Sequence, residues 1–259
     1  MKAKKHLGQH WLNDKATLYK IVESANVSKD DTVLEVGPGR GSLTEVLAEV
    51  AGQVIAIEFD ADLVPGLKAN FATRENVNIT EENILDYDIS ELSAGYKVVA
   101  NIPYYITSPI IQKFLSSSNP PAVLVLLVQK EVAQRIVASP GQMSVLAVSV
   151  QLMAEVELID YVGKEYFVPP PEVDSAILKI TPLAKPLFDV DEKQFYSLIK
   201  AGFGEKRKKL RNSLSGGMQI KTSLVEEVLK KSGISETARA QELSLDDWYN
   251  LYTQFAALH

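Results

Sequence analysis

Residues 33–49 read VLEVGPGRGSLTEVLAE, and this stretch decides the fold class. The apolar run before Gly37 is typical of a buried strand, and the run after Gly41 has the spacing of an amphipathic helix. The glycines between them permit positive φ angles and let a ligand approach the backbone closely. The N-terminus of the helix favours anionic or hydrogen-bond-accepting groups. The stretch therefore predicts a strand, a binding loop and a helix, although a tight turn without a ligand is the alternative.

The spacing of the glycines indicates which ligand to expect. A dinucleotide site has G-x-G-x-x-G and an acidic residue about 20 positions later. Here the pattern is shortened to G-x-G-x-G, and Glu58 follows Gly37 by 21 positions. A carboxylate there can accept both hydroxyls of a ribose. The short loop resembles that of S-adenosylmethionine-dependent methyltransferases, so we expect a nucleoside cofactor and favour S-adenosylmethionine over NAD.

Short β-branched runs alternate with helical patterns over the first two-thirds of the chain, which predicts an α/β fold with a mostly parallel sheet. The expected strands are residues 32–37, 54–58, 77–80, 98–102 and 122–128. The expected helices are residues 14–25, 42–50, 61–71, 108–116 and 130–138. Runs at 154–162 and 176–181 have no clear helical pattern between them, and they predict an antiparallel hairpin at the sheet edge.

A connector that contains proline, residues 181–191, ends the β-rich part of the chain. The patterns after it are helical, at residues 193–202, 206–214, 223–231 and 245–257. We therefore expect a Rossmann-like methyltransferase domain over residues 1–184. A small all-α domain is expected over residues 185–259.

Composition excludes several kinds of chemistry. The chain has no cysteine, which excludes zinc ribbons, iron–sulfur clusters and thiolate nucleophiles. The three histidines are His6, His10 and His259. Because they stand at the two ends of the sequence, we expect neither a histidine metal site nor a Ser-His-Asp triad. The longest apolar run, residues 122–128, is far shorter than the roughly 20 residues of a membrane-spanning helix, and the basic start lacks the apolar region of a secretory signal. We expect a cytoplasmic protein that does not bind membranes.

Charge is distributed unevenly along the chain. The net charge of −6 divides into −7 over residues 1–185 and +1 over residues 186–259. The second part carries a dense basic cluster, opposed only by Glu205: Lys200, Lys206, Arg207, Lys208, Lys209 and Arg211. A second basic spot contains Lys2, Lys4 and Lys5. Local clusters of this kind determine where polyanions bind.

The tetrapeptide N-I-P-Y at residues 101–104 follows the fourth expected strand. Ligands of doubly wound sheets bind beyond the carboxyl ends of the strands, so this loop lies beside the cofactor. The Asn101 side chain and the Ile102 carbonyl can each accept one N–H of an exocyclic amine, and Tyr104 can stack on a base. Two such acceptors stabilise the positive charge that develops on the nitrogen during methyl transfer. Alone, N-x-P-Y would more simply be a turn that closes a strand; its position here favours methylation of adenine N6.

The motifs together resemble the ribosomal RNA adenine N6-dimethyltransferases, in particular the bacterial enzymes that dimethylate two adjacent adenosines in the 3′-terminal hairpin of 16S rRNA. The resemblance covers nearly the whole chain. Its motifs are KKHLGQHWLND (4–14), LEVGPGRGSLT (34–44), IEFD (57–60), NIPYYIT (101–107), VQKEVAQRIVASPG (128–141), FVPPPEVDSAI (167–177), FGEKRKKLRNSL (203–214) and ARAQELSLDDW (238–248).

The resemblance implies a role for each matching residue. The residues that match the family's cofactor site are His10, Leu12, Gly37, Gly39, Glu58, Asn83 and Asn101. Those that match its catalytic loop and the aromatic stack on the flipped adenine are Asn101, Pro103, Tyr104 and Phe167. For Phe167, the alternative is a core phenylalanine held by the prolines that follow.

Some positions depart from the family pattern. Asn83 replaces an aspartate that contacts the adenine amino group of the cofactor; its amide oxygen can accept the same bond without charge. Tyr105 and His10 each stand at a position where the family often has asparagine. The stretch GQMSVLAVSV, residues 141–150, lacks a tyrosine-glycine pair that the family has.

RNA binding is expected at a basic helix over residues 206–214, through Lys206, Arg207, Lys208, Lys209 and Arg211. The alternative is a solvated helix face. The resemblance implies a monomer that acts on 16S rRNA in a small ribosomal subunit or its precursor.

Three rival functions are a large-subunit rRNA adenine methyltransferase of the antibiotic-resistance type, a ribosome-assembly or transcription factor that only binds, and a DNA adenine methyltransferase. The F-G-E-K-R-K-K-L-R-N motif argues against the large-subunit enzyme. The intact cofactor loop together with N-I-P-Y argues against a protein that only binds. Ile102 stands where a DNA adenine methyltransferase usually has a proline.

Overall fold

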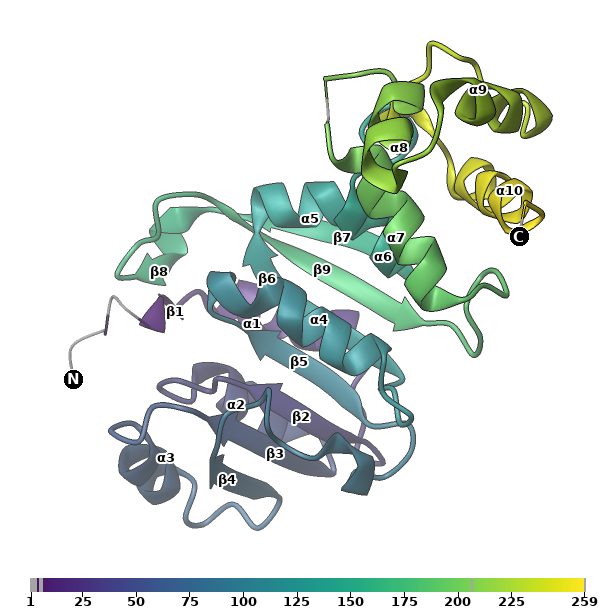
Figure 1. Ribbon diagram of the computed structural model, residues 1–259. Helices are drawn as coiled ribbons and strands as arrows, with labels where there is room; N and C mark the ends of the chain where they lie inside the picture. Colours follow the sequence, from purple (N-terminus) through teal and green to yellow (C-terminus); the bar gives the residue numbers. More distant parts are fainter. Residues whose placement is uncertain (1–3, 5–6, 206, 259) are drawn as a thin grey trace. The chain divides into compact units, whose positions relative to one another are not determined.

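A seven-stranded sheet lies at the centre of the larger of two compact units in the computed structural model, which describes residues 4, 7–205 and 207–258. From one edge to the other its strands are β4 (Val77–Glu81), β3 (Gln53–Glu58), β2 (Thr32–Val36), β5 (Lys97–Asn101), β6 (Val123–Gln129), β9 (Ser175–Pro182) and β7 (Ala154–Val162) (Figure 1). The first five pair in parallel, whereas β9 runs antiparallel to both β6 and β7. The expected parallel sheet with an antiparallel hairpin at its edge is confirmed.

Three of the four connections between successive parallel strands contain an α-helix, as the alternating pattern predicts, and the connection between β4 and β5 contains a 3₁₀ turn. The helices of this unit are α1 (Lys15–Ser24), α2 (Ser42–Val50), α3 (Val64–Asn70), α4 (Thr107–Leu115) and α5 (Lys130–Ile136), of which α5 continues into the second unit. Short 3₁₀ turns are η2 (Ile89–Glu91), η3 (Tyr104–Ile106) and η4 (Lys164–Tyr166). Helix α1 begins where the Asp14 side chain accepts a hydrogen bond from the Thr17 N–H at 2.8 Å. Its apolar face joins that of α2 and the sheet in one buried cluster.

A second, two-stranded sheet joins two distant segments of the chain. Strand β1 (Trp11–Leu12) pairs antiparallel with β8 (Phe167–Val168), so that Trp11 faces Val168 and Leu12 faces Phe167 (Figure 1). The Asn13 N–H extends this pairing to the Tyr166 carbonyl at 3.0 Å. Residues 11–13 are thereby fixed beside the F-V-P-P-P stretch.

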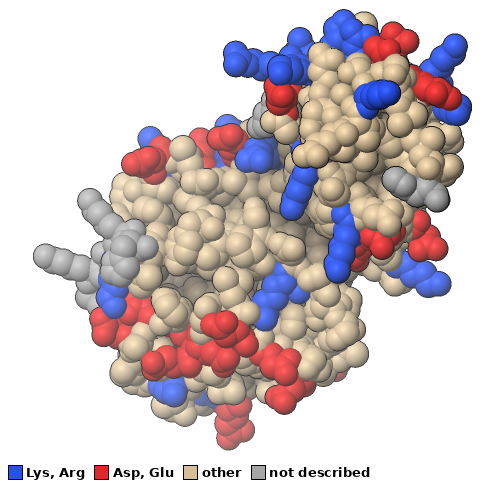
Figure 2. Space-filling view, viewed as in Figure 1, with Lys and Arg blue, Asp and Glu red and all other residues tan. Residues whose placement is uncertain are grey.

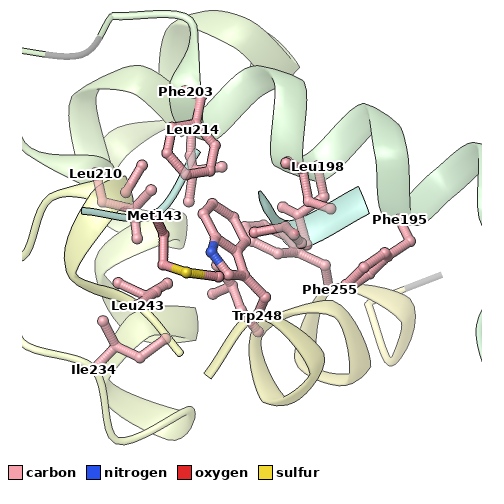
Figure 3. Close-up of a cluster of buried hydrophobic side chains, with 14 of the residues drawn as sticks. Met143, Phe195, Leu198, Phe203, Leu210, Leu214, Ile234, Leu243, Trp248 and Phe255 are labelled. Carbon is pink, nitrogen blue, oxygen red and sulfur yellow. The ribbon is translucent and has the colours of Figure 1, made fainter. Parts of the chain in front are cut away.

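The second unit is entirely helical in the part that the structure describes, and it comprises Gln134–Met153 and Leu183–His259. Its elements are α6 (Val145–Gln151), α7 (Glu192–Phe203), α8 (Leu210–Met218), α9 (Thr222–Lys231), η5 (Ala240–Glu242) and α10 (Leu245–Ala256). These helices surround the fully buried Trp248, which stacks on Phe203 with ring centroids 5.4 Å apart (Figure 3). The chain passes from the first unit to the second between residues 182 and 183, close to the boundary expected at residue 184, but residues 134–153 also belong to the helical unit.

Apolar packing explains why residues 134–153 join the helical unit. Met143, Ala147, Val148 and Leu152 are buried in the cluster that contains Trp248. Figure 3 shows Met143 beside the Trp248 ring. The helices expected from the sequence pattern include none after residue 138 in this segment, whereas the structure has α6, capped by a Ser144 side chain that accepts from the Ala147 N–H.

The basic segment after α7 is not the helix expected over residues 206–214. Helix α8 begins only at Leu210, which is fully buried and whose N–H donates to the Ala238 carbonyl at 2.8 Å. Before it, a turn brings the Lys208 N–H to the Glu205 carbonyl at 2.9 Å. Arg207, Lys208 and Lys209 therefore lie in a loop, and Lys206 is outside the described residues.

Among the helices described, none is long and apolar enough to cross a membrane.

Candidate active site

A pocket opens at the carboxyl ends of β2, β3 and β5, where ligands of such sheets bind. The predicted site residues that line it are His10, Leu12, Gly37, Gly39, Glu58, Asn83, Asn101, Pro103 and Tyr104. They come from five separate segments of the sequence, and the fold brings them around one cavity. Tyr105, which departs from the family pattern, also lines it and is 61% exposed.

The glycine loop has the backbone that its sequence predicts. Gly37 and Gly39 both have positive φ, +67° and +61°. A Cβ at Gly39 would lie 2.9 Å from the Trp11 indole, so only glycine fits beneath that ring. A Cβ at Gly37 would point into the space toward the Asn101 carbonyl and Pro103, 3.9 Å from each. This cradle suits a ligand that lies against the backbone.

Glu58 stands at the end of β3 with only 5% of its surface exposed. Its Oε2 accepts from the Gly39 N–H at 3.0 Å and its Oε1 accepts from the Asp60 N–H at 2.8 Å. Burial raises the pKa of the carboxyl above its ordinary value, and these backbone N–H groups oppose the rise. Each oxygen retains lone-pair capacity, which is what a ribose diol requires.

Asn83 lines the same pocket shortly after β4, but its amide is engaged on both sides. Oδ1 accepts from the Leu85 N–H at 3.1 Å, and Nδ2 donates to Asp86 Oδ2 at 2.8 Å. The oxygen is therefore already hydrogen-bonded to the backbone of its own turn. Its assignment as the acceptor for an adenine amino group stays a prediction.

The N-I-P-Y loop follows β5, and its two outer residues are held by other segments. Asn101 Nδ2 donates to the His10 carbonyl at 3.1 Å. The Tyr104 ring is stacked with the His10 ring, with centroids 6.0 Å apart, and its hydroxyl is 2.7 Å from Ser175 Oγ. Burial raises the pKa of Tyr104. The loop thus presents an amide oxygen and an aromatic ring in fixed positions.

Phe167 is placed differently from its expected role. The side chain is 2% exposed and packs in the hydrophobic core with Leu12, Leu18 and Ile177. It is absent from the residues that line the pocket. To sandwich a base against Tyr104 it would have to leave that core, so its position agrees better with the alternative of a core phenylalanine.

Several residues at the site were missed by sequence reasoning. Glu35 is 1% exposed, and its Oε2 has no hydrogen-bond partner among the described residues. Burial, reinforced by the nearby Glu58 charge, raises the pKa of this carboxyl to about 8. Gln9 and Asp60 both line the pocket, and the Gln9 side chain donates a hydrogen bond to the Asp60 carboxylate. All three stand inside the quoted motifs, but nothing in their spacing distinguishes them from their neighbours.

The predicted RNA-binding residues have unequal surroundings. Arg211 donates to Glu226 at 2.7 Å and is 30% exposed, so it joins α8 to α9. Lys208 forms an exposed pair with Glu205 at 2.5 Å. Figure 2 shows Lys and Arg side chains along the upper edge of the second unit with Asp and Glu side chains among them, and Asp and Glu side chains predominate across the lower part of the first unit.

Comparison with known proteins identifies close relatives. The family described as "Ribosomal RNA adenine dimethylase" matches residues 1–257. "Ribosomal RNA small subunit methyltransferase A" of Dehalococcoides mccartyi (strain CBDB1) is 42% identical over 260 residues, which cover 99% of this chain and 89% of that protein. The protein of the same name from Caldanaerobacter subterraneus subsp. tengcongensis is 43% identical, covering 97% of this chain and 96% of that protein.

Two solved structures share nearly the whole fold. A dimethyladenosine transferase from Plasmodium falciparum is 27% identical with a TM-score of 0.82, covering 96% of this chain and 98% of that one. The 23S rRNA methyltransferase ErmE is 28% identical with a TM-score of 0.77, covering 95% and 99%.

Proposed function

The chain belongs to the ribosomal RNA adenine dimethylase family, and from this we propose that it transfers methyl groups to N6 of two adjacent adenosines in the 3′-terminal hairpin of 16S rRNA. It is an S-adenosylmethionine-dependent rRNA adenine dimethyltransferase. The choice of the small-subunit rRNA is supported by the names of relatives about 40% identical over nearly the full chain. One observation carries the site assignment: Asn101 directs its amide nitrogen at the His10 carbonyl, which leaves its oxygen for a substrate amine.

The pocket fits the cofactor in its polar groups and its shape. Glu58 would hold the ribose hydroxyls, and the Gly37–Gly39 cradle would admit the cofactor against the backbone, because a side chain at Gly37 would project into this space. Leu12 and His10 would cover it, and Asn83 would accept from its adenine amino group. When bound, S-adenosylmethionine supplies the activated methyl group.

The target amine would be held between the Asn101 side-chain oxygen and the Ile102 carbonyl, each accepting one N–H. The buried position of Ile102 and the fixed φ of Pro103 support this proposal, because a restricted backbone would need little rearrangement when the substrate binds. Tyr104 would stack on the flipped base. As positive charge develops on nitrogen these hydrogen bonds strengthen, and the departing proton passes to solvent. A strong base is not required.

RNA would bind through the basic loop before α8, in which Lys208 and Lys209 are exposed. Phosphate contacts there would supply affinity, and the shape of the folded hairpin would supply selectivity. We place the activity in the cytoplasm, on a small subunit or its precursor, with the protein acting as a monomer.

The test is mass spectrometry of rRNA after incubation with the protein and labelled S-adenosylmethionine. Wild-type protein should add two methyl groups to each of two adjacent adenosines of the small-subunit rRNA and none to the large-subunit rRNA. Asn101→Ala should lower turnover by about 10²–10³ while cofactor affinity changes less. Asn78→Ala, at an exposed asparagine of β4, is the matched control and should leave both unchanged. Methylation of the large-subunit rRNA instead would overturn the substrate assignment.

A further inference from the structure

A group of hydrogen bonds at the mouth of the pocket fastens residues 8–13, which we call the strap. Asp60 is the centre of this group. Its Oδ1 accepts from Lys4 Nζ at 2.6 Å, and its Oδ2 accepts from Gln9 Nε2 at 2.7 Å. The Gln9 oxygen accepts from the Lys4 N–H at 2.8 Å, so both ends of the Gln9 amide are engaged. The orientation of this amide is therefore fixed.

Asp60 is ionised at neutral pH although its side chain is only 4% exposed. Burial alone would raise the pKa of this carboxyl, but hydrogen bonds from Lys4, Gln9 and the Asp62 N–H lower it below its ordinary value. Hydrogen bonds to a charged acceptor are about twice as strong as those between neutral groups. The bond between Asp60 and Gln9 is consequently a firm attachment for the strap.

The residue after Gln9 contacts the catalytic loop. The His10 carbonyl accepts from Asn101 Nδ2 at 3.1 Å. A carboxamide has one donor end and one acceptor end, so this bond determines which end faces the pocket. Among the described residues, no hydrogen bond occupies the Asn101 oxygen. The strap thus holds Asn101 in the orientation that accepts from an amine.

The strap is attached at both of its ends. Beyond His10, Trp11 and Leu12 pair with β8, and His10 Nδ1 lies 2.8 Å from the Pro169 carbonyl. Before His10, the attachment is the Gln9 side chain on Asp60. If the hydrogen bond between Gln9 and Asp60 were lost, the peptide that carries the His10 carbonyl would be held only from its C-terminal side.

We propose that Asp60 is a positioning residue for methyl transfer: by binding Gln9 it fixes the His10 carbonyl, which in turn orients the Asn101 amide. This inference rests on the proposed reaction at Asn101. Asp60 acts through His10 and Asn101 rather than on the reacting atoms. It also leaves Glu58 in place, because Glu58 accepts from the backbone N–H of Asp60, which a side-chain substitution retains.

Three variants isolate this role. Asp60→Asn keeps a single oxygen, and because Lys4 Nζ and the Asp62 N–H both donate at the Oδ1 position, the new N–H₂ group faces the Gln9 N–H₂ group. Adding Gln9→Glu to Asp60→Asn restores a donor and an acceptor with their positions exchanged, and it keeps a carboxylate beside Lys4. Asp62→Asn is the matched control, because Asp62 also pairs with Lys4 at 2.6 Å but is 67% exposed and does not bond to Gln9.

Two readouts are needed, and one is independent of activity. The first is kcat and KM for methylation. The second is acrylamide quenching of tryptophan fluorescence, because the only two tryptophans are Trp11 in the strap, 8% exposed, and the fully buried Trp248. Asp60→Asn should lower kcat roughly 10- to 100-fold, change the KM for S-adenosylmethionine less, and increase quenching. The double variant should return kcat to within about threefold of wild type and restore quenching.

Wild-type kcat and quenching in Asp60→Asn would overturn the proposal. A loss of activity without increased quenching, or without rescue by Gln9→Glu, would overturn it too, because the effect would then bypass the strap. If Asp60→Asn fails to fold, Gln9→Ala decides by the same two criteria. A wild-type protein that methylates no rRNA would instead refute the proposed function, and the strap would still be judged from quenching.

Discussion

The Tyr104 hydroxyl lies 2.7 Å from the hydroxyl of Ser175, a fully buried residue 71 positions later in the sequence. The bond joins the catalytic loop to the first residue of β9. It fixes the Tyr104 ring but leaves the face of the ring as the contact with a base. Tyr104→Phe should therefore lower single-turnover methylation by less than about tenfold, whereas Tyr104→Ala should lower it by about 100-fold, because base stacking contributes roughly 1–3 kcal/mol. Ser175→Ala should match Tyr104→Phe; a severe defect in Tyr104→Phe alone would show that the hydroxyl takes part in the reaction.

Glu58→Ala should weaken S-adenosylmethionine binding at least tenfold, or about 1.4 kcal/mol, in isothermal calorimetry. The reason is the loss of both carboxylate oxygens at the end of β3, where they face the pocket. Glu75→Ala, at an exposed position outside the pocket, is the control. Unchanged affinity in Glu58→Ala would mean that another group holds the ribose.

Asn83→Asp tests the departure from the family pattern, and the structure shows that Asp86 complicates it. Asn83 donates to Asp86 at 2.8 Å, so the single variant would place two carboxylates side by side. The sequence alone predicts that Asn83→Asp preserves or tightens cofactor binding. With Asp86 in this position, we expect the gain only when Asp86→Asn is added, which restores the hydrogen bond with donor and acceptor exchanged. If calorimetry shows weaker binding in the double variant, Asn83 donates to the cofactor rather than accepting from it.

Glu35 makes stability depend on pH in a direction opposite to that of a salt-bridged acid. Burial raises its pKa from the ordinary 4.5 to about 8, so between these values the folded protein binds more protons than the unfolded chain. The free energy of unfolding that Glu35 contributes therefore falls as pH rises through this range. Glu35→Gln should remove the decline, and its Tm relative to wild type should rise by at least about 4 °C between pH 5 and pH 8. Parallel Tm profiles in the two proteins would show that Glu35 is ionised in the folded state.

The basic loop should control RNA affinity but not cofactor binding. Lys208→Glu with Lys209→Glu should weaken RNA binding and reduce the salt slope of log K by about one for each phosphate that is no longer neutralised. The matched control is Lys230→Glu with Lys231→Glu on α9 in the same unit. Arg211 is best left intact, because Arg211→Glu would face Glu226 and lower the Tm. Equal effects of the two double variants would mean that the loop has no special role.

The sequence sufficed for the parts of the fold that local patterns determine. Strand β6 is a continuous apolar run that is buried on both faces, and the glycine loop requires backbone angles that other residues rarely adopt. The site was predictable where a motif has a chemical reason, as for Glu58 and Asn101. Phe167 was not, because an aromatic ring next to prolines has the same sequence whether it faces a core or a base.

Pairings between distant segments were equally hidden. Arg211 belongs to a basic cluster in the sequence, yet Glu226, fifteen positions later, determines its role. Asp60 stands in the motif that supplies Glu58, and only the fold brings Gln9 to it. Residues 134–153 gave no sign that their apolar side chains pack around Trp248.

Residues 134–153 belong to the second unit although residues of the first unit precede and follow them in the sequence. This arrangement determines the order in which the two units can be completed during synthesis. The ribosome releases Val148 and Leu152 more than 40 residues before Phe195, the first buried aromatic of α7, and about 100 residues before Phe255. Strand β7 likewise emerges before β9, which must insert between it and β6. Apolar side chains from the middle of the chain therefore remain exposed until the residues that cover them have been synthesised. Chaperones bind to partly folded chains that expose such side chains, and aggregation begins from them. A nascent chain halted after residue 184 would carry a complete sheet and an uncovered apolar segment, the buried face of α6.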